Sequence, residues 1–166
     1  NLSSDAGAGV LTGPGDLINT DPRLASAGNY GGTTQTLALL PGSPAINAGT
    51  AAGAPATDQR GVGRVGAVDI GAFESRGFTL ALTSGNNQSA GPGLAFANPL
   101  TATVTAIDTG EPVLGGVVTF TPPGAGASAA LAPNPAPIGA GGVASSTATA
   151  NTTVGAYSVT AAANTG

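Results

Sequence analysis

Leu100-Thr101-Ala102-Thr103-Val104-Thr105-Ala106 is the stretch of sequence that decides the fold, because apolar residues and threonines alternate strictly along it. A period of two places the apolar side chains on one face of a β-strand and the threonines on the other. We expect the apolar side chains to face the protein core and the three threonines to face solvent. The pattern therefore predicts a strand that is buried on one face only.

Further short strands are predicted at residues 78–82, 117–121, 143–150 and 156–161. Turns rich in glycine, proline and asparagine separate the strands, which is typical of an antiparallel β-sandwich. The side chains expected in the core of this sandwich are Phe78, Leu80, Leu82, Leu100, Val104, Val118, Phe120, Tyr157 and Val159. We therefore expect an all-β fold.

The composition excludes long helices. Of the 166 residues, 28 are glycine and 13 are proline, and one of these interrupts every long window that could form a helix. Four basic and eight acidic residues give a net charge of −4, so charge repulsion does not keep the protein unfolded. Small side chains on closely approaching backbones are expected to build the core.

The absence of certain residue types excludes several classes of function. The sequence has no lysine, and its four arginines cannot neutralise a run of phosphates, so no nucleic-acid partner is expected. No apolar run approaches the roughly 18 residues of a membrane span. The lack of cysteine and histidine removes disulfides, thiolate sites and the commonest general base. Because the first residue is Asn1 and not methionine, we expect a processed product or a segment of a longer polypeptide.

The distribution of charge predicts two structural units. Residues 1–77 hold ten of the charged residues, whereas residues 78–166 hold only Asp108 and Glu111. The boundary falls near Arg76, directly before the first predicted strand. We therefore expect units at residues 1–77 and 78–166, joined by almost no linker.

The second unit carries a series of phrases in a fixed order: Gly110-Glu111-Pro112-Val113, Val117-Val118-Thr119-Phe120, Gly142-Val143-Ala144 and Val154-Gly155-Ala156-Tyr157-Ser158-Val159-Thr160-Ala161. This series resembles the invasin/intimin-type bacterial immunoglobulin-like domain over most of residues 78–166. The resemblance implies an Ig-like antiparallel β-sandwich. Such domains finish with another strand after the one that contains Tyr157, so we expect a sandwich that lacks its last strand.

Two explanations of the missing strand stay open. A neighbouring molecule could donate it by β-strand complementation, with residues 1–11 as a candidate donor. Alternatively, the natural polypeptide extends past Gly166 into its own last strand or a following repeat.

The first unit carries a second ordered series: Thr12-Gly13-Pro14-Gly15-Asp16-Leu17, Asp21-Pro22-Arg23-Leu24, Leu39-Leu40-Pro41-Gly42-Ser43-Pro44-Ala45-Ile46-Asn47-Ala48-Gly49, Asp58-Gln59-Arg60-Gly61 and Asp69-Ile70-Gly71-Ala72-Phe73-Glu74. These phrases resemble the closing section of right-handed parallel β-helix proteins of the bacterial surface. The resemblance implies that residues 1–74 form the terminal coils and cap of such a helix, stabilised by glycine turns and stacked small residues.

One cluster of acids invites a chemical interpretation. Asp69 and Glu74, beside Arg60 and Arg64, could form an acid/base pair for glycoside or uronate chemistry. The favoured interpretation is structural: these charges pair with one another and accept hydrogen bonds from backbone N–H groups in tight turns.

No catalytic residue, cofactor or metal ligand is predicted. Asp5, Asp16, Asp21 and Asp58 could supply oxygen ligands to calcium, but no calcium-loop or nonapeptide repeat surrounds them.

Two functions from different classes are compatible with these features. The favoured hypothesis is a non-enzymatic structural module of a secreted or cell-surface bacterial protein, either an adhesin stalk or an extracellular filament subunit. Its expected partners are copies of itself or neighbouring repeats of the same polypeptide, with host or cell-surface polysaccharide as a further candidate. The alternative is a fragment of a carbohydrate-active β-helix enzyme with an accessory Ig-like domain.

Overall fold

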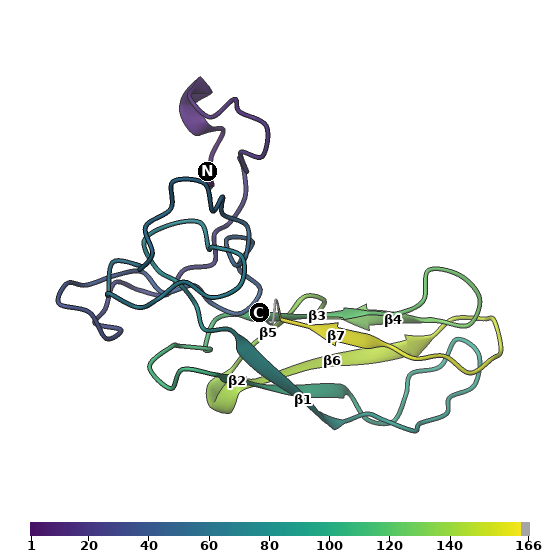
Figure 1. The fold of residues 1–166 in the computed structure, drawn as a ribbon. Helices are drawn as coiled ribbons and strands as arrows, with labels where there is room; N and C mark the ends of the chain where they lie inside the picture. Colours follow the sequence, from purple (N-terminus) through teal and green to yellow (C-terminus); the bar gives the residue numbers. More distant parts are fainter. Residues whose placement is uncertain (164–166) are drawn as a thin grey trace.

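Two antiparallel sheets occupy the second half of the protein in the computed structural model, which describes residues 1–163. The elements are η1 (Gly7–Gly9), β1 (Phe78–Ser84), β2 (Leu100–Ala106), β3 (Val117–Thr121), β4 (Ala129–Ala132), β5 (Ala136–Pro137), η2 (Ala140–Gly142), β6 (Val143–Ala150) and β7 (Thr160–Ala162). One sheet has the order β1-β2-β6-β4 and the other β5-β3-β7. The protein is therefore all-β, with almost no helix and sheets consistent with a β-sandwich (Figure 1).

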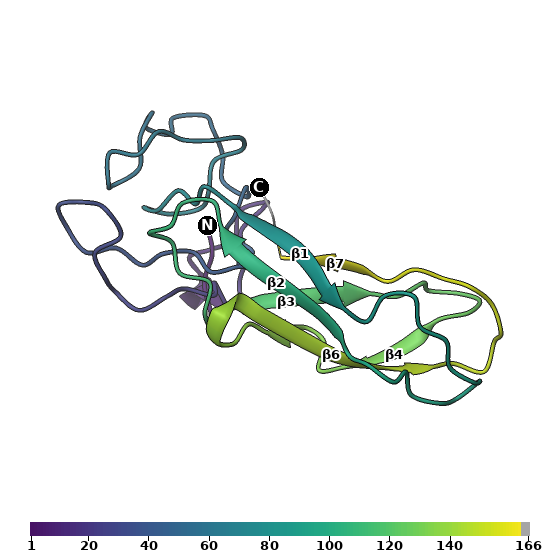
Figure 2. The ribbon, with the colours of Figure 1, turned by 90° about the horizontal axis from the view of Figure 1, so that it is seen from below.

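The alternating stretch forms β2, which lies between β1 and β6 (Figure 2). β1 pairs with β2 so that Phe78 faces Ala106, and β6 pairs with the opposite edge of β2. Val104 is buried and Thr105 is exposed, which confirms the predicted parity. Thr101 and Thr103 are half-buried. They point away from the core, but the flanking strands shield them.

Two of the other predicted strands are found. Residues 117–121 form β3, the centre of the smaller sheet, and residues 143–150 form β6 of the larger sheet. The strand predicted at 156–161 is recognised only from Thr160, where β7 pairs with β3. β4 and β5 were not predicted because prolines dominate that stretch. There the Asn134 side chain bonds both the N–H and the C=O of Phe120 and so ties the proline-rich segment to β3.

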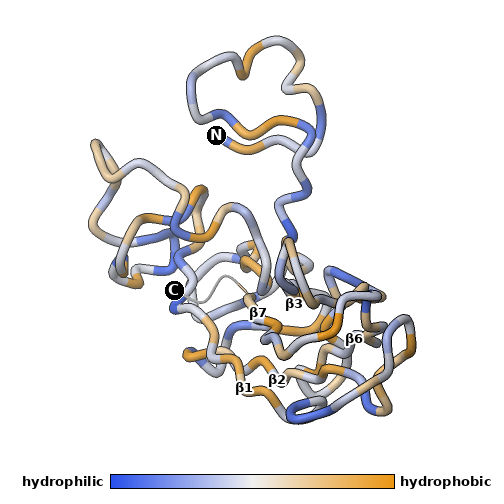
Figure 3. Tube along the Cα trace, turned by 90° about the vertical axis from the view of Figure 1, so that its right-hand side faces the viewer, coloured by the Kyte–Doolittle hydropathy of each residue, from blue (hydrophilic) through white to orange (hydrophobic). Residues whose placement is uncertain are grey.

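Residues 1–77 contain η1 but no strand, and isolated bridges hold them together. One bridge, Leu2 to Leu17, is parallel, and three are antiparallel: Leu24 to Leu39, Gly28 to Thr36 and Thr57 to Gly63. The regular coils of a parallel β-helix are thus not shown in this unit. Residues 4–16 form a loop that projects from the rest of the protein (Figures 1 and 3).

A single hydrophobic core runs through both units. Its buried members are Ala38, Leu39, Ala45, Ile46 and Phe73 from the first unit and Phe78, Ala102, Val104, Val118, Phe120, Ala136, Ile138, Ala144 and Ala163 from the second. Apolar stretches of the sequence accordingly gather along β1, β2, β3 and β7 (Figure 3). The first unit therefore packs directly on the end of the sheets.

Four of the predicted core residues are fully buried: Phe78, Val104, Val118 and Phe120. Four others, Leu80, Leu100, Tyr157 and Val159, are only partly buried. The prediction was wrong for Leu82, whose side chain is 48% exposed. Leu82 lies near the end of β1, where no strand covers it.

Candidate functional site

Asp58 and Arg60 form the centre of a buried charged network in the first unit. The Arg60 guanidinium donates from Nε to Asp58 Oδ2 at 2.8 Å, and the two side chains are at most 1% exposed. The guanidinium also donates to the backbone carbonyl oxygens of Tyr30 and Glu74 and stacks 3.6 Å from the centre of the Phe73 ring. Arg60 therefore joins three separate turns by its fixed planar geometry.

Glu74 and Asp69 are occupied by backbone donors. Glu74 Oε1 accepts from the N–H of Val65, and Oε2 accepts from the N–H of Asp69 and from Nη1 of Arg64, all within 3.1 Å. The oxygens of Asp69 accept from the N–H groups of Asn47 and Ser75 at 2.7 and 2.6 Å. The structure thus brings the four charged residues that the sequence singled out into one neighbourhood.

This arrangement fits the structural interpretation of the cluster better than the chemical one. Every carboxylate oxygen of Asp58, Asp69 and Glu74 accepts at least one hydrogen bond from the protein. Glu74 is completely buried. A general acid or base must reach its substrate, and these groups face turn backbone instead.

Burial and hydrogen bonding act against each other on these acids. Burial raises the pKa of Asp69 above its ordinary value, although the N–H groups of Asn47 and Ser75 act to lower it. Burial also acts to raise the pKa of Asp58, but the Glu74 N–H and the Arg60 side chain outweigh it and hold that pKa below the ordinary value. Of Asp58 and Asp69, Asp58 is therefore the one whose ionised form the fold stabilises.

Glu111 connects the two units. Its side chain, which is buried, accepts from Ser75 Oγ at 2.7 Å and from the N–H of Arg76 at 2.8 Å. Burial raises the pKa of Glu111. The sequence placed Glu111 only within a family phrase. The sequence feature that could have singled Glu111 out is its isolation, because it is one of two charged residues in an otherwise uncharged unit.

Backbone hydrogen bonds cross the same junction. Val117 N–H donates to Pro41 C=O at 2.9 Å, and Gly42 N–H donates to Ala163 C=O at 3.2 Å. A Cβ at Gly116 would lie 2.7 Å from the Pro41 carbonyl oxygen, so glycine permits this close approach. The first unit is thus fastened to β3 and to the end of β7.

A cavity of about 830 Å³ lies at the opposite end of the sandwich, and we call it the edge groove. Its lining residues are Leu82, Ser84, Gly85, Asn86, Asn87, Gln88, Ser89, Ala90, Pro92, Phe96, Leu100, Phe120, Ser128, Ala148, Ala150, Asn151, Thr153, Val154, Gly155, Ala156, Tyr157, Ser158 and Val159. None of them carries a charge. The groove thus runs between the end of β1 and the segment that leads into β7.

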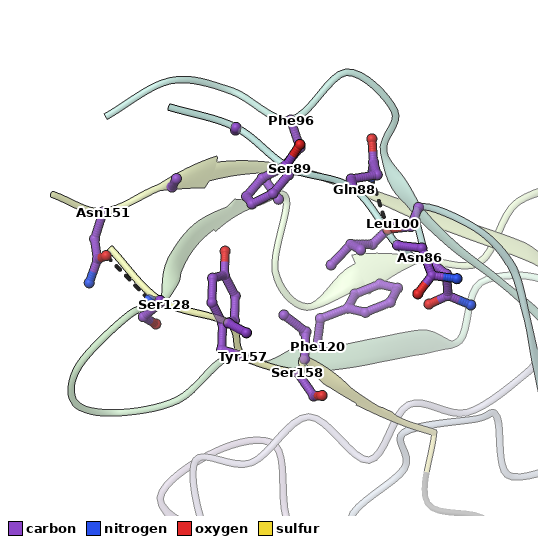
Figure 4. Close-up of a pocket in the computed structure, with 18 of the residues that line it drawn as sticks. Asn86, Gln88, Ser89, Phe96, Leu100, Phe120, Ser128, Asn151, Tyr157 and Ser158 are labelled. Atoms are coloured by element: carbon purple, nitrogen blue, oxygen red, sulfur yellow. Dashed lines mark hydrogen bonds between the residues drawn. The ribbon is translucent and has the colours of Figure 1, made fainter. Parts of the chain in front are cut away.

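Aromatic side chains from different segments meet in the edge groove. Phe96 and Tyr157 approach it from opposite sides, with ring centroids 6.4 Å apart in an edge-to-face arrangement (Figure 4). The loop between β1 and β2 is fixed by Gln88, whose amide bonds the backbone of Gly85 and Asn98. The groove is therefore a formed apolar site with polar amides at its rim.

The segment from Val154 to Val159 leaves its backbone unpaired. Among the described residues, no N–H or C=O of this segment takes part in a hydrogen bond. Its side chains nevertheless alternate, since Tyr157, Val159 and Ala161 are half-buried while Ala156 and Ser158 are exposed. The segment thus has the side-chain pattern of a strand without the partner of one.

Residues 1–11, the candidate strand donor, do not form an extended segment. Gly7, Ala8 and Gly9 all have positive φ within η1, which an edge-pairing strand does not allow. Val10 beside them is 80% exposed.

The remaining features are a second cavity and two negative findings. A second cavity of about 600 Å³ in the first unit is lined by apolar and uncharged polar side chains, including Leu24, Leu37 and Phe73. Among residues 1–163 no three acids gather closely enough to hold a metal ion. The part of the protein that the structure describes also has no helix long and apolar enough to cross a membrane.

Comparison with known proteins gives no match: no family model, no curated protein and no solved structure is similar to this sequence.

Proposed function

We propose that this protein is a non-enzymatic structural module of a secreted or cell-surface bacterial protein, serving as an adhesin stalk or an extracellular filament subunit. One observation carries the proposal: the buried acids are all engaged in holding turns and the junction together. Asp58, Asp69 and Glu74 bind backbone N–H groups of the first unit, and Glu111, from the second unit, binds Ser75 and Arg76 at the end of the first. The charged residues are thus used for rigidity.

The strand order supports an Ig-like assignment for residues 78–166. In an Ig constant-type sandwich, one sheet has the order A-B-E-D and the other contains C, F and G. The order β1-β2-β6-β4 corresponds to the first sheet, and β3 and β7 correspond to C and F. Among residues 1–163 no strand occupies the far side of β7, where G would lie. For the first unit, the sequence resemblance of residues 1–74 to the end of a parallel β-helix is the sole support for a role as terminal coils and cap.

The junction supports a role as a stalk. A stalk must transmit force between its units, and here a buried side chain, three backbone hydrogen bonds among the described residues and a common core join them. A flexible linker would leave each unit free to rotate. Small-angle X-ray scattering of the 166-residue protein should therefore fit one elongated rigid particle.

The enzymatic alternative gives the decisive test. The protein is incubated with acidic and neutral polysaccharides, and new reducing ends are measured. We expect none above buffer. Turnover that disappears in both Asp69→Asn and Glu74→Gln, while circular dichroism shows both variants folded, would overturn the proposed structural role.

A further inference from the structure

Five residues that the sequence assigns to the core are left partly open by the structure, and all of them except Leu80 share one location. Leu82, Leu100, Tyr157 and Val159 all line the edge groove. Because side chains alternate between the two faces of a strand, each of these four should point into the core between the two sheets. Leu82 at 48% exposure shows how far this burial fails. The core is thus complete at the junction end and incomplete at the groove.

The groove also specifies the chemistry of what would complete it. The unpaired N–H and C=O groups of residues 154–159 recur along an extended segment, so a polypeptide backbone satisfies them and a lipid or a small apolar molecule does not. None of the lining residues is charged, so a charged side chain placed inside would be buried without a partner. Apolar side chains at alternate positions would cover Leu82 and Tyr157.

We propose that the edge groove is a strand-acceptor site that binds one extended, uncharged polypeptide segment with apolar side chains at alternate positions. The bound segment pairs with the backbone of residues 154–159 by β-strand addition and covers the open core. This inference deepens the proposed structural role, on which it rests, by naming the kind of segment that completes the sandwich.

Amide hydrogen exchange of the whole protein tests the proposal directly. The probe is a synthetic peptide with the sequence of residues 100–106, which is uncharged and alternates apolar residues with threonine. A peptide of the same composition, scrambled to break the alternation, is the control. Because successive N–H groups of a strand point to opposite sides, we expect alternate amides of residues 154–159 to exchange about tenfold more slowly when the peptide is bound.

A pair of variants locates the site. Leu82→Asp places a charge in the groove at a position exposed enough to fold, and should weaken peptide binding about tenfold or more. Leu114→Asp makes the same change at a residue that is 64% exposed and outside the groove, and should bind normally.

Three results would overturn the proposal. They are unchanged exchange of residues 154–159 at saturating peptide, equal binding of the scrambled peptide, and saturable binding of dodecanoate in the groove when the peptide does not bind. Polysaccharide turnover, by contrast, would refute the structural role and leave a measured strand-acceptor site intact.

Discussion

Ser75 Oγ donates a hydrogen bond of 2.7 Å to Glu111 Oε2, across 36 residues of sequence and across the boundary between the two units. The same hydroxyl accepts from the N–H of Gly77, so it is held on both sides. Glu111 Oε1 takes the N–H of Arg76. The end of the first unit is therefore fixed by a carboxylate from the second unit, in the loop between β2 and β3.

Replacing Glu111 with glutamine should destabilise the protein. The amide keeps one acceptor oxygen but presents an N–H group to the second donor, so one buried hydrogen bond is lost, at a cost of about 1–3 kcal/mol. Urea unfolding followed by circular dichroism measures the change. Asp108→Asn is the matched control, because it removes the same charge nearby and keeps an oxygen for the Gly110 N–H. Equal stability of the two variants would contradict the role of Glu111.

Asp58 and Glu111 should respond to acid in opposite directions. The pKa of Asp58 lies below its ordinary value of 3.8, so the unfolded state binds its proton first as the pH falls. Its contribution to stability is present above that value and is lost as the pH falls through the folded-state pKa. The pKa of Glu111 lies above its ordinary value of 4.5, so its contribution is largest below 4.5 and declines as the pH rises through the folded-state pKa.

Unfolding free energies of the parent protein, Asp58→Asn and Glu111→Gln at several pH values separate the two effects. As the pH falls, the difference in unfolding free energy between the parent and Asp58→Asn should shrink. The difference between the parent and Glu111→Gln should grow. If both differences moved in the same direction, the assignment of the two shifts would be wrong.

Arg60→Lys should cost about 3 kcal/mol of unfolding free energy although the charge is kept. A lysine ammonium cannot reach Asp58, the carbonyls of Tyr30 and Glu74 and the face of Phe73 together. Thermal unfolding measures the loss. Arg23→Lys is the control, since no hydrogen bond or ion pair of its side chain is found among the described residues, and it should be nearly neutral. A neutral Arg60→Lys variant would show that the network needs only a positive charge.

The register of β2 predicts unequal effects at adjacent positions. Val104→Asp buries an unpaired carboxylate and should cost several kcal/mol, whereas Thr105→Asp lies on the exposed face and should cost little. Chemical denaturation of both variants checks this. Similar losses would mean that the strand is shifted by one residue, because such a shift exchanges its faces.

Periodicity was enough to predict β1, β2, β3 and β6, because each is covered on one face and exposed on the other. It failed where tertiary contacts decide. β5 pairs with β3 although it ends in Pro137, and residues 154–159 alternate without a partner strand. The local sequence of a segment does not specify which strand lies beside it in the folded protein.

The charged cluster was predictable in part. The sequence indicated that Asp69, Glu74 and the nearby arginines pair in turns, and the structure shows this pairing for Arg64 and Glu74, whereas Arg60 pairs with Asp58 instead. It could not indicate which backbone groups these side chains reach, since Asn47 and Asp69 are 22 residues apart. Gly71 illustrates the same limit: its φ of +116° explains the glycine, while the open space around it excludes close approach as the reason.

Phe73 and Phe78 belong to one core. The boundary at residue 77 therefore separates two different chain topologies, but the two units are stabilised together. Cutting the polypeptide at that position would expose both rings to water and abolish the cooperativity that links the halves. Calorimetry should accordingly record one transition, with equal calorimetric and van't Hoff enthalpies, for the intact protein. The irregular first unit and the sheets of the second would therefore act mechanically as one body.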